Sequence, residues 1–311
     1  MHILVLSGGL SHERDVSLRS GRRLANSLRE VLPDSVISES DVTAETLQVI
    51  SMDKPDCVIP VIHGAVGEDG SLRNVLESLG IPFVGSSAQA ARLAFDKGVA
   101  NSLVPQENVP RFVVLPQSFF RELGANSVID AVVSDLTFPL VVKPLTGGSA
   151  LGVTFCLTRD DIPSAMVAAF GYDDHVMIQQ AVTGTELAIT VVERGDEAAA
   201  LPPVEIVPVR GMYDYHARYT AGHTEFFTPA RLTASDTQHV TDFALSVHKV
   251  LGLRDISRTD LILDAEGNIW FIEVNVAPGM TETSLVPMAI SAAGLSVGQV
   301  FGELALAATR R

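Results

Sequence analysis

The strongest chemical signal in the sequence lies near its C-terminal end, where carboxylates, an amide and a guanidinium stand on two neighbouring apolar segments. Arg258-Thr-Asp260 begins the first segment, Glu273-Val-Asn275 ends the second, and Ala265-Glu-Gly267 between them is typical of a hairpin turn. Side chains alternate across a strand, so Glu273 and Asn275 share one face. Arg258 and Asp260 likewise share a face. If the two faces meet, hard oxygen ligands converge beside a positive charge, and Mg²⁺ prefers such ligands.

A solvated sheet face is the alternative interpretation of these acids. Glu273 follows Trp270-Phe-Ile272 and precedes Val274, so its strand is apolar on both faces. A carboxylate in such surroundings needs a cation or a partner. We therefore predict a metal site formed by Asp260, Glu273 and Asn275, provided that no one-residue slip in register separates them.

A glycine-rich segment gives a second signal. Lys143–Gly152 follows the apolar strand Pro139–Lys143 and contains Gly147, Gly148 and Gly152. Glycines allow a loop to turn its N–H groups toward an anion, and a lysine meets a phosphate as a point charge. The lysine precedes the glycines, so the segment matches neither a Walker A loop nor the dinucleotide fingerprint. From these residues alone, a phosphate loop and a plain β-turn both remain open.

Three further polar motifs are candidates for a site. Ser11–Ser17 follows the first strand, and its acids either bind a ligand or favour the start of a helix. His63–Gly70 places a histidine at the carboxyl end of a strand, where a site histidine is more expected than a structural one. Tyr213–Tyr219 is aromatic and basic, which fits either a mobile lid or a packed surface loop.

The first hundred residues alternate between strand and helix patterns. Ile3–Leu6 and Cys57–Ile62 are buried-strand runs, Val16–Val31 is helical, and Ile81–Gly85 is a short third strand. This alternation predicts a parallel sheet with helices on both faces. Its polar motifs follow the strands, at the edge where sites of such sheets lie.

The second half of the chain has a more antiparallel pattern. Strands are expected at Leu187–Val192, at Val204–Val209 and in the hairpin between Thr259 and Asn275, and an amphipathic helix closes at about Leu304. With 311 residues and no internal repeat, we expect three α/β or α+β domains: 1–95, 96–182 and 183–311.

Composition excludes several classes of protein. The chain has 22 basic and 37 acidic residues, a net charge of −15, which argues against a nucleic-acid partner. ATP remains compatible because phosphate sites are local. Cys57 and Cys156 form neither a disulfide framework nor a metal cluster, and we expect buried thiols in a reducing compartment. With no signal peptide and no apolar run of membrane-spanning length, a soluble cytoplasmic protein without membrane contact is expected.

Taken in order, the motifs resemble the D-alanine–D-alanine ligase family of the ATP-grasp superfamily, over almost the whole chain. The resemblance rests on these segments: Gly9–Ser17, His63–Gly70, Tyr213–Tyr219, Arg258-Thr-Asp260, Glu273–Met280 and Thr283–Met288. It implies the three-domain ATP-grasp architecture, with a doubly wound parallel-sheet domain first and ATP between the other two. It also implies that a first D-alanine is phosphorylated on its carboxylate and then attacked by the amine of a second, for peptidoglycan precursor synthesis.

The resemblance also implies roles for individual residues. The catalytic group is Glu13, Ser149, Tyr219, Arg258 and Gly279. The substrate-binding group is Val16, His63, Ser284 and Leu285. The ATP-binding group is Lys97, Lys143, Gly148, Gln179, Gln180, Ala181, Val182, Glu186 and Arg218. The metal ligands are Asp260, Glu273 and Asn275, for two Mg²⁺ ions or for Mn²⁺, and a homodimer is implied.

Within these groups, the resemblance implies specific partners. Glu13 pairs with the ammonium of the first D-alanine and joins Ser149 and Tyr219 in a hydrogen-bonded trio. Arg258 and the Gly279 N–H stabilise the oxyanion. A tyrosine at 219 favours an amine nucleophile, because depsipeptide-forming members of the family differ there.

The chain departs from the family at four places. Gly147–Ala150 replaces a usual Glu-Gly-Ser-Ser, Arg218 replaces a lysine, Gln179-Gln180 replaces acidic positions, and Asn101 replaces a second lysine. All four fall on ATP-binding or lid positions. Two alternatives to D-alanyl-D-alanine synthesis stay open: a ligase with a different second substrate (D-serine, D-lactate or another amino acid), and a silent nucleotide-binding regulator.

Overall fold

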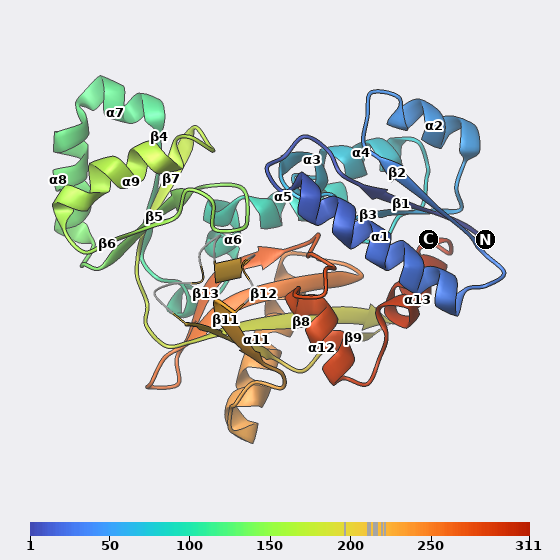
Figure 1. Ribbon diagram of the computed structural model, residues 1–311. Helices are drawn as coiled ribbons and strands as arrows, with labels where there is room; N and C mark the ends of the chain where they lie inside the picture. The colour runs from blue at the N-terminus through green and yellow to red at the C-terminus, as the bar shows by residue number, and fades with distance from the viewer. Residues whose placement is uncertain (196, 210–212, 214–216, 219, 221) are drawn as a thin grey trace.

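The computed structural model describes residues 1–195, 197–209, 213, 217–218, 220 and 222–311, and Figure 1 shows its three sheets. The first is parallel, with strand order β2-β1-β3. The second is antiparallel, with order β4-β7-β5-β6. The third is antiparallel, with order β11-β10-β8-β12-β13 and β9 paired to β8. The predicted mixture of α/β and α+β architecture is confirmed.

The first sheet is built from the N-terminal part of the chain. Its elements are β1 (His2–Ser7), α1 (Arg14–Val31), β2 (Val36–Asp41), α2 (Thr46–Asp53), β3 (Cys57–Pro60), α3 (Ala65–Glu68), α4 (Ser71–Ser78) and α5 (Ala88–Phe95). Alternate residues of β1 are buried on opposite faces. Ile3 and Val5 pack in one cluster with residues of α1 and of the C-terminal helix α13 (Val297–Ala308), whereas Leu4 and Leu6 pack with α2 and α4. This is the doubly wound arrangement that the alternating pattern predicted.

One strand in this part was missed, and one predicted strand was wrong. The strand β2 was missed because its sequence, Val-Ile-Ser-Glu-Ser-Asp, is half polar, as an edge strand can be. Ile81–Gly85 forms only an isolated parallel bridge between Phe83 and Val58. Pro82 has no N–H to donate to a ladder, so only its carbonyl and the Val84 N–H bond to Val58.

The second sheet lies in the middle of the chain. Its elements are α6 (Lys97–Leu103), η1 (Gln106–Asn108), β4 (Phe112–Pro116), α7 (Gln117–Leu123), α8 (Ala125–Asp135), β5 (Leu140–Pro144), β6 (Thr154–Cys156), η2 (Arg159–Asp161), α9 (Ile162–Ala169) and β7 (His175–Gln180). The strand β5 carries Lys143 toward the glycine-rich segment that joins β5 to β6. The helices α7, α8 and α9 form the upper left lobe in Figure 1.

The third sheet occupies the C-terminal part. Its elements are β8 (Thr185–Arg194), β9 (Glu197–Ala200), β10 (Val204–Pro208), β11 (Thr224–Phe227), α11 (Ala234–Val250), β12 (Ile256–Leu263), β13 (Ile269–Asn275), α12 (Leu285–Ala292) and α13. The predicted strands and the hairpin are confirmed. The last helix continues to Ala308, four residues beyond its expected end near Leu304, because Leu304, Ala305 and Ala308 are buried in the core shared with β1.

Two remaining expectations concern cysteines and membrane spans. Cys57 and Cys156 are both buried free thiols, as predicted. No single helix within the described ranges is long and apolar enough to cross a bilayer. The consecutive helices α12 and α13, bent by 98°, pass that test of length and composition only when they are taken together.

Candidate active site

The hairpin of β12 and β13 brings the C-terminal acids to one place. In its antiparallel register Asp260 stands opposite Glu273, and Arg258 stands opposite Asn275. Residues directly opposite each other point to the same face of a sheet. A β-bulge follows between Asp260 and Leu261, and beyond it Leu261 pairs with Phe271. The polar residues before the bulge keep their common face. The register that the sequence analysis set as a condition is therefore present, and the two polar faces meet.

Arg258 and Asp260 form a buried bidentate ion pair. Nε and Nη2 of Arg258 each lie 2.7 Å from a carboxylate oxygen of Asp260. Burial acts to lower the pKa of Arg258, but the charge of Asp260, its hydrogen bonds and the charge of Glu273 together raise that pKa above its ordinary value. Arg258 therefore stays charged, and its orientation is fixed by two parallel hydrogen bonds.

Glu273 lies among cations. Lys97 Nζ is 3.7 Å from its carboxylate, and Arg218, Lys143 and Arg258 also attract it. Burial acts to raise the pKa of Glu273, but these positive charges together lower it below the ordinary value. Glu273 is therefore an anion at neutral pH, as a metal ligand must be.

The donor set fits a magnesium site. Asp260 and Glu273 supply two carboxylates on one face, and the side-chain oxygen of Asn275 accepts the Ala277 N–H at 2.8 Å, which orients its amide. In the part of the chain that the structure describes, no group of three or more His, Cys, Asp or Glu side chains is arranged to hold a metal. Two carboxylates with an amide oxygen leave positions that phosphate oxygens and water complete around Mg²⁺.

A small cavity of about 70 Å³ adjoins these groups. It collects most of the residues expected to bind amino-acid substrates or to act on them: Glu13, Val16, His63, Ser149, Arg258, Gly279, Ser284 and Leu285. Segments up to 272 positions apart in the sequence therefore meet here. Tyr219, the third member of the expected trio, lies outside the described residues.

Glu13 belongs to this cavity and does not cap a helix. It stands directly before α1, yet its side chain accepts no hydrogen bond from the helix backbone. Its carboxylate accepts the Ser149 hydroxyl instead, a contact between the N-terminal segment and the glycine-rich loop. Of the two interpretations of this acid, the geometry supports ligand binding.

His63 and Gly279 face each other across the cavity. A Cβ added at Gly279 would lie 2.9 Å from the Ser284 hydroxyl and 3.9 Å from His63 Nε2, so glycine leaves the space that a substrate needs. Burial lowers the pKa of His63, against the opposing charge of Glu13, and its Nε2 has no hydrogen-bond partner among the described residues. A neutral imidazole with an unmatched nitrogen is therefore directed at the cavity.

A larger cavity of about 630 Å³ opens beside the small one. It is lined by all of the expected ATP-binding residues: Lys97, Lys143, Gly148, Gln179, Gln180, Ala181, Val182, Glu186 and Arg218. The two cavities share Gly148, Tyr213, Arg218 and Glu273 in their walls. The volume is in the range of nucleotide and drug-sized sites.

The glycine-rich loop turns sharply between these cavities. Gly147, Ser149, Ala150 and Gly152 all have positive φ, at 93°, 53°, 55° and 70°. Two of them are not glycine, and such residues adopt this region at a conformational cost. Lys97 Nζ donates to the Gly147 carbonyl at 2.6 Å and so holds the loop against the Glu273 site. The loop departs from the family sequence, yet it still contacts Glu13 and Lys97.

Two groups of the segment Gln180-Ala181 in the wall of the large cavity are already hydrogen-bonded. The Ala181 N–H already donates to the Pro139 carbonyl at 2.9 Å, so it does not offer a donor to an adenine. The side chain of Gln180 is also engaged, with Thr137. A contact between ATP and Ala181, one of the expected ATP-binding residues, would therefore use a group other than its N–H.

Glu186 and Arg218 line the same cavity. Burial raises the pKa of Glu186 to about 7, against the attraction of Arg218. The Arg218 guanidinium lies 4.3 Å from the centroid of the Tyr213 ring and donates to the Tyr213 carbonyl. Tyr213 was not predicted as a site residue, although it lines both cavities and begins the lid motif. Thr281 and Thr283 were missed as well, because no local pattern marks them as part of the small cavity.

Lys143 is expected to give the site a pH dependence. Its Nζ donates to the Gln179 side chain at 2.9 Å, and burial lowers its pKa to about 8. Lys143 is charged below that pH and neutral above it, so kcat/KM for ATP is expected to fall as pH rises through about 8. The Lys143→Arg variant keeps its charge and is expected to lack this decline. An equal decline in both enzymes, measured by initial rates from pH 6.5 to 9.5, would contradict the assignment.

Comparison with known proteins identifies the family of this chain. Residues 35–86 match the family model for the D-ala D-ala ligase N-terminus, and residues 107–305 match the one for the C-terminus. The chain is 34% identical to a D-alanine–D-alanine ligase of Fervidobacterium nodosum, with 100% of both chains covered.

Two solved structures are similar over the whole fold. A D-alanine–D-alanine ligase of Bacillus anthracis in complex with ATP matches with a TM-score of 0.81 and 26% identity, covering 100% of this chain and 98% of that one. The VanG D-Ala:D-Ser ligase of Enterococcus faecalis also matches with a TM-score of 0.81, at 27% identity, covering 99% and 98%. The chain therefore belongs to the D-alanine–D-alanine ligase family.

Proposed function

We propose that this enzyme joins two D-alanine molecules to D-alanyl-D-alanine, driven by ATP through an acyl phosphate. One observation carries the proposal. A cavity large enough for a nucleotide and a small polar cavity share a wall that includes Glu273 and Gly148. A phosphoryl group held at this wall is within reach of a carboxylate in the small cavity. A binding protein that only retains a nucleotide has no need of the second cavity.

In the first step a carboxylate oxygen of one D-alanine attacks the γ-phosphorus of ATP, and ADP leaves. A carboxylate is a poor electrophile, and the acyl phosphate that forms has a good leaving group. Lys97, Lys143 and Arg218 line the large cavity and would hold the phosphates against their mutual repulsion. Glu13 would pair with the ammonium of this D-alanine, and Val16 and His63 would border it.

Asp260, Glu273 and Asn275 would hold Mg²⁺ near the transferred group. The chain belongs to a family that uses ATP, and two bound ions, with Mn²⁺ as a substitute, would neutralise the charge of the phosphoryl oxygens. The protein's own contribution is orientation: the hairpin register fixes the two carboxylates, and the Ala277 N–H fixes the amide of Asn275.

In the second step the amine of another D-alanine attacks the acyl carbon, and inorganic phosphate leaves. Arg258 and the Gly279 N–H would donate to the oxyanion that forms. Ser284 precedes the eight-residue helix α12, whose first residue is Leu285. A helix N-terminus favours a negative group, so the carboxylate of the second D-alanine would lie there. Ser149 and Tyr219 would complete the contact with Glu13.

The architecture supports three further proposals. We infer domains at 1–95, 96–182 and 183–311, each with one of the three sheets. The expected ATP-binding residues, from Lys97 to Arg218, come from the second and third domains. We also infer a homodimer and a cytoplasmic location, as the family resemblance implies for a user of ATP.

A second candidate function differs only in the second substrate. The VanG D-Ala:D-Ser ligase has the same TM-score to this chain as the D-alanine–D-alanine ligase described above, so the fold does not separate them. D-Serine or D-lactate would enter the same small cavity.

Phosphate release from ATP tests the proposal. When ATP and D-alanine are present without another amino acid, we expect phosphate release and D-alanyl-D-alanine as the product by mass spectrometry. When ATP is present without D-alanine, we expect no release. Release only when D-serine or D-lactate accompanies D-alanine would favour the second candidate. No release with any amino acid would exclude ligase activity.

A further inference from the structure

We propose that Arg73, Ser20 and Arg23 are positioning residues for the proposed ligation, because they hold the loop 275–280 that carries Asn275 and Gly279. All three lie on helices of the N-terminal sheet, α4 and α1, whereas the loop follows β13 of the third sheet. The inference rests on the proposed function and adds residues to it that none of the recognised motifs contains.

Arg73 is an unusual residue to find in a protein interior. Its side chain is 1% exposed, and its described hydrogen bonds go to two carbonyl oxygens, those of Gly67 and Val276. Its Nε has no partner among the described residues. Burial lowers the pKa of Arg73 to about 10, despite the nearby charges of Glu68 and Asp69. A buried guanidinium whose described hydrogen bonds go to carbonyl oxygens, with no described ion pair, costs desolvation free energy, which points to a role other than stability.

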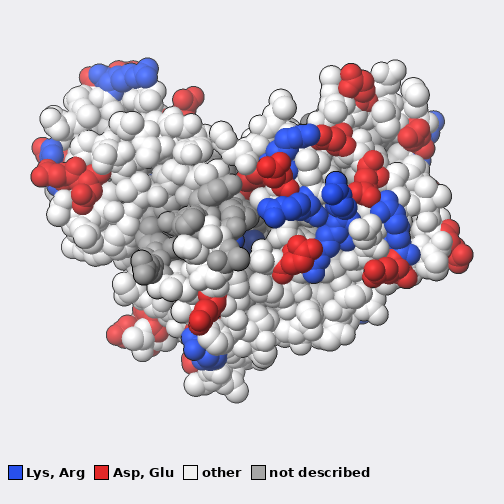
Figure 2. Space-filling model, in the orientation of Figure 1, with Lys and Arg blue, Asp and Glu red and all other residues white. Residues whose placement is uncertain are grey.

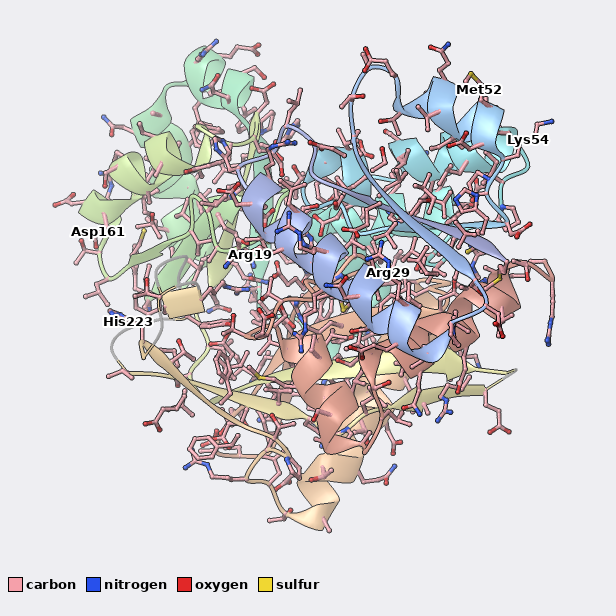
Figure 3. The ribbon with its side chains drawn as sticks, turned by 45° about the vertical axis from the view of Figure 1, so that its right-hand side comes forward. Arg19, Arg29, Met52, Lys54, Asp161 and His223 are labelled. Atoms are coloured by element: carbon pink, nitrogen blue, oxygen red, sulfur yellow. The ribbon has the colours of Figure 1, made fainter. Side chains whose placement is uncertain are left out.

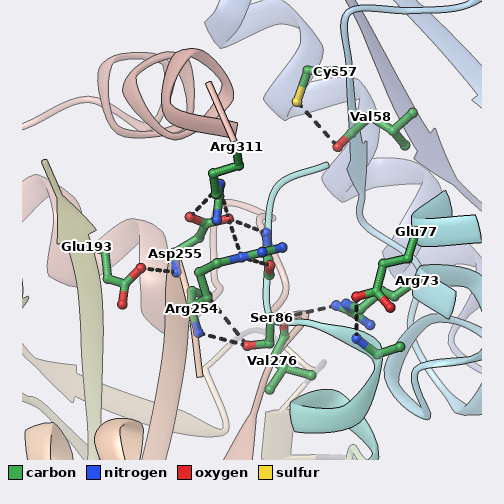
Figure 4. Close-up of polar contacts among 12 residues, drawn as sticks. Cys57, Val58, Arg73, Glu77, Ser86, Glu193, Arg254, Asp255, Val276 and Arg311 are labelled. Carbon is green, nitrogen blue, oxygen red and sulfur yellow. Dashed lines mark hydrogen bonds and ion pairs between the residues drawn. The ribbon is translucent and has the colours of Figure 1, made fainter. Parts of the chain in front are cut away.

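The contact with Val276 reaches Asn275 through one peptide group. Arg73 Nη2 donates to the Val276 carbonyl at 3.3 Å, a contact drawn in Figure 4. The N–H of the same peptide belongs to Ala277, and it donates to the Asn275 side-chain oxygen at 2.8 Å. A peptide group is planar, so fixing its carbonyl also fixes the direction of its N–H. Arg73 therefore orients the amide of Asn275 without touching it.

Helix α1 holds the other end of the loop. The Ser20 hydroxyl accepts the Met280 N–H at 3.0 Å, and Arg23 Nη1 donates to the Met280 carbonyl at 3.2 Å. The Met280 N–H belongs to the peptide that follows Gly279, so these contacts limit how Gly279 can rotate. Ser20 is fully buried, as expected for a residue that joins two layers.

The same helix supplies a matched control. Arg14, Arg19, Arg22, Arg23 and Arg29 all lie on α1, and Figure 2 shows basic side chains gathered over this part of the surface. Figure 3 shows Arg19 and Arg29 along its outer side. Arg22 is exposed and directly precedes Arg23. Arg22 and Arg23 are thus both arginines and are neighbours on the same helix, but only Arg23 has a described hydrogen bond to the loop.

The test compares Arg23→Ala, Ser20→Ala and Arg73→Gln with Arg22→Ala. We expect kcat with D-alanine to fall about tenfold in Arg23→Ala and Ser20→Ala and about 100-fold in Arg73→Gln, since small displacements of reacting groups have such effects. KM for ATP is expected to stay within about twofold of wild type, because the loop lies outside the large cavity. Arg22→Ala should behave as wild type.

The outcomes separate positioning from stability. A lower melting temperature with wild-type kcat in the folded variants would overturn the inference. If Arg73→Gln does not fold, Arg23→Ala and Ser20→Ala decide, and wild-type kcat in both overturns it. A wild-type enzyme that releases no phosphate with D-alanine would instead remove the proposed function itself, and this inference with it.

Discussion

Replacement of Glu273 by glutamine is expected to lower kcat by about 10³-fold or more while the protein stays folded. Glutamine keeps the size of the side chain and removes its charge. Glu273 stands opposite Asp260 and beside Lys97, so the substitution takes one of two carboxylates from the proposed metal site. Groups that stabilise transition-state charge are worth about 3–4 kcal/mol each, and a metal ligand supports more than one such interaction.

The measurement is D-alanine-dependent phosphate release over a range of Mg²⁺ concentrations. Glu303→Gln is the matched control, because Glu303 is half exposed and pairs with Arg194 away from both cavities. The control should keep wild-type turnover. If Glu273→Gln also turned over at a near-normal rate, Glu273 would not be a metal ligand.

Replacement of Arg258 by lysine is the second large effect, with an expected loss of about 10²–10³-fold in kcat. Lysine keeps the positive charge but cannot form the fork that now spans both oxygens of Asp260. The proposed oxyanion donor would then lose its fixed direction. Because Asp260 is buried, a poorly matched partner would also disturb the proposed metal site, of which Asp260 is a ligand.

Arg194→Lys serves as the control for this variant. Arg194 also makes a bidentate pair, with Glu303 on the surface. Its replacement therefore shows what the loss of a bidentate Arg–carboxylate pair does to turnover when the pair lies away from the site. Surface pairs contribute little, and we expect unchanged turnover. A kcat for Arg258→Lys within threefold of wild type would argue that a point charge suffices and that the fork has no catalytic role.

Much of the fold was predictable because the decisive patterns are local. The apolar runs and the turn residues along 259–275 predicted the hairpin, and alternation predicted which side chains share a face. The register itself was a condition of the prediction, and the structure meets it with Asp260 opposite Glu273. The β2 strand was not predictable in the same way. Its residues alternate only weakly, and its place at the edge of the sheet follows from pairing with β1, which the local sequence does not encode.

The residue types of the site were predictable from the sequence, whereas the backbone conformation and the long-range hydrogen bonds that position them were less so. The sequence indicated Glu13 and Ser149 through family resemblance, and the structure brings them into contact. It gave no sign that Ser149 has a positive φ, since that region usually selects glycine. Nothing in the sequence indicated that Arg73 has a functional role, because the proposed role depends on its hydrogen bond to the carbonyl of Val276, 203 positions away.

The measurement that tests the central claim most directly follows the oxygen atoms of the first D-alanine. With D-alanine labelled by ¹⁸O in its carboxylate, an acyl phosphate transfers one labelled oxygen to phosphorus. We predict one ¹⁸O atom in the inorganic phosphate released for each D-alanyl-D-alanine formed. Unlabelled phosphate, or labelled phosphate without dipeptide, would contradict ATP-driven ligation through an acyl phosphate.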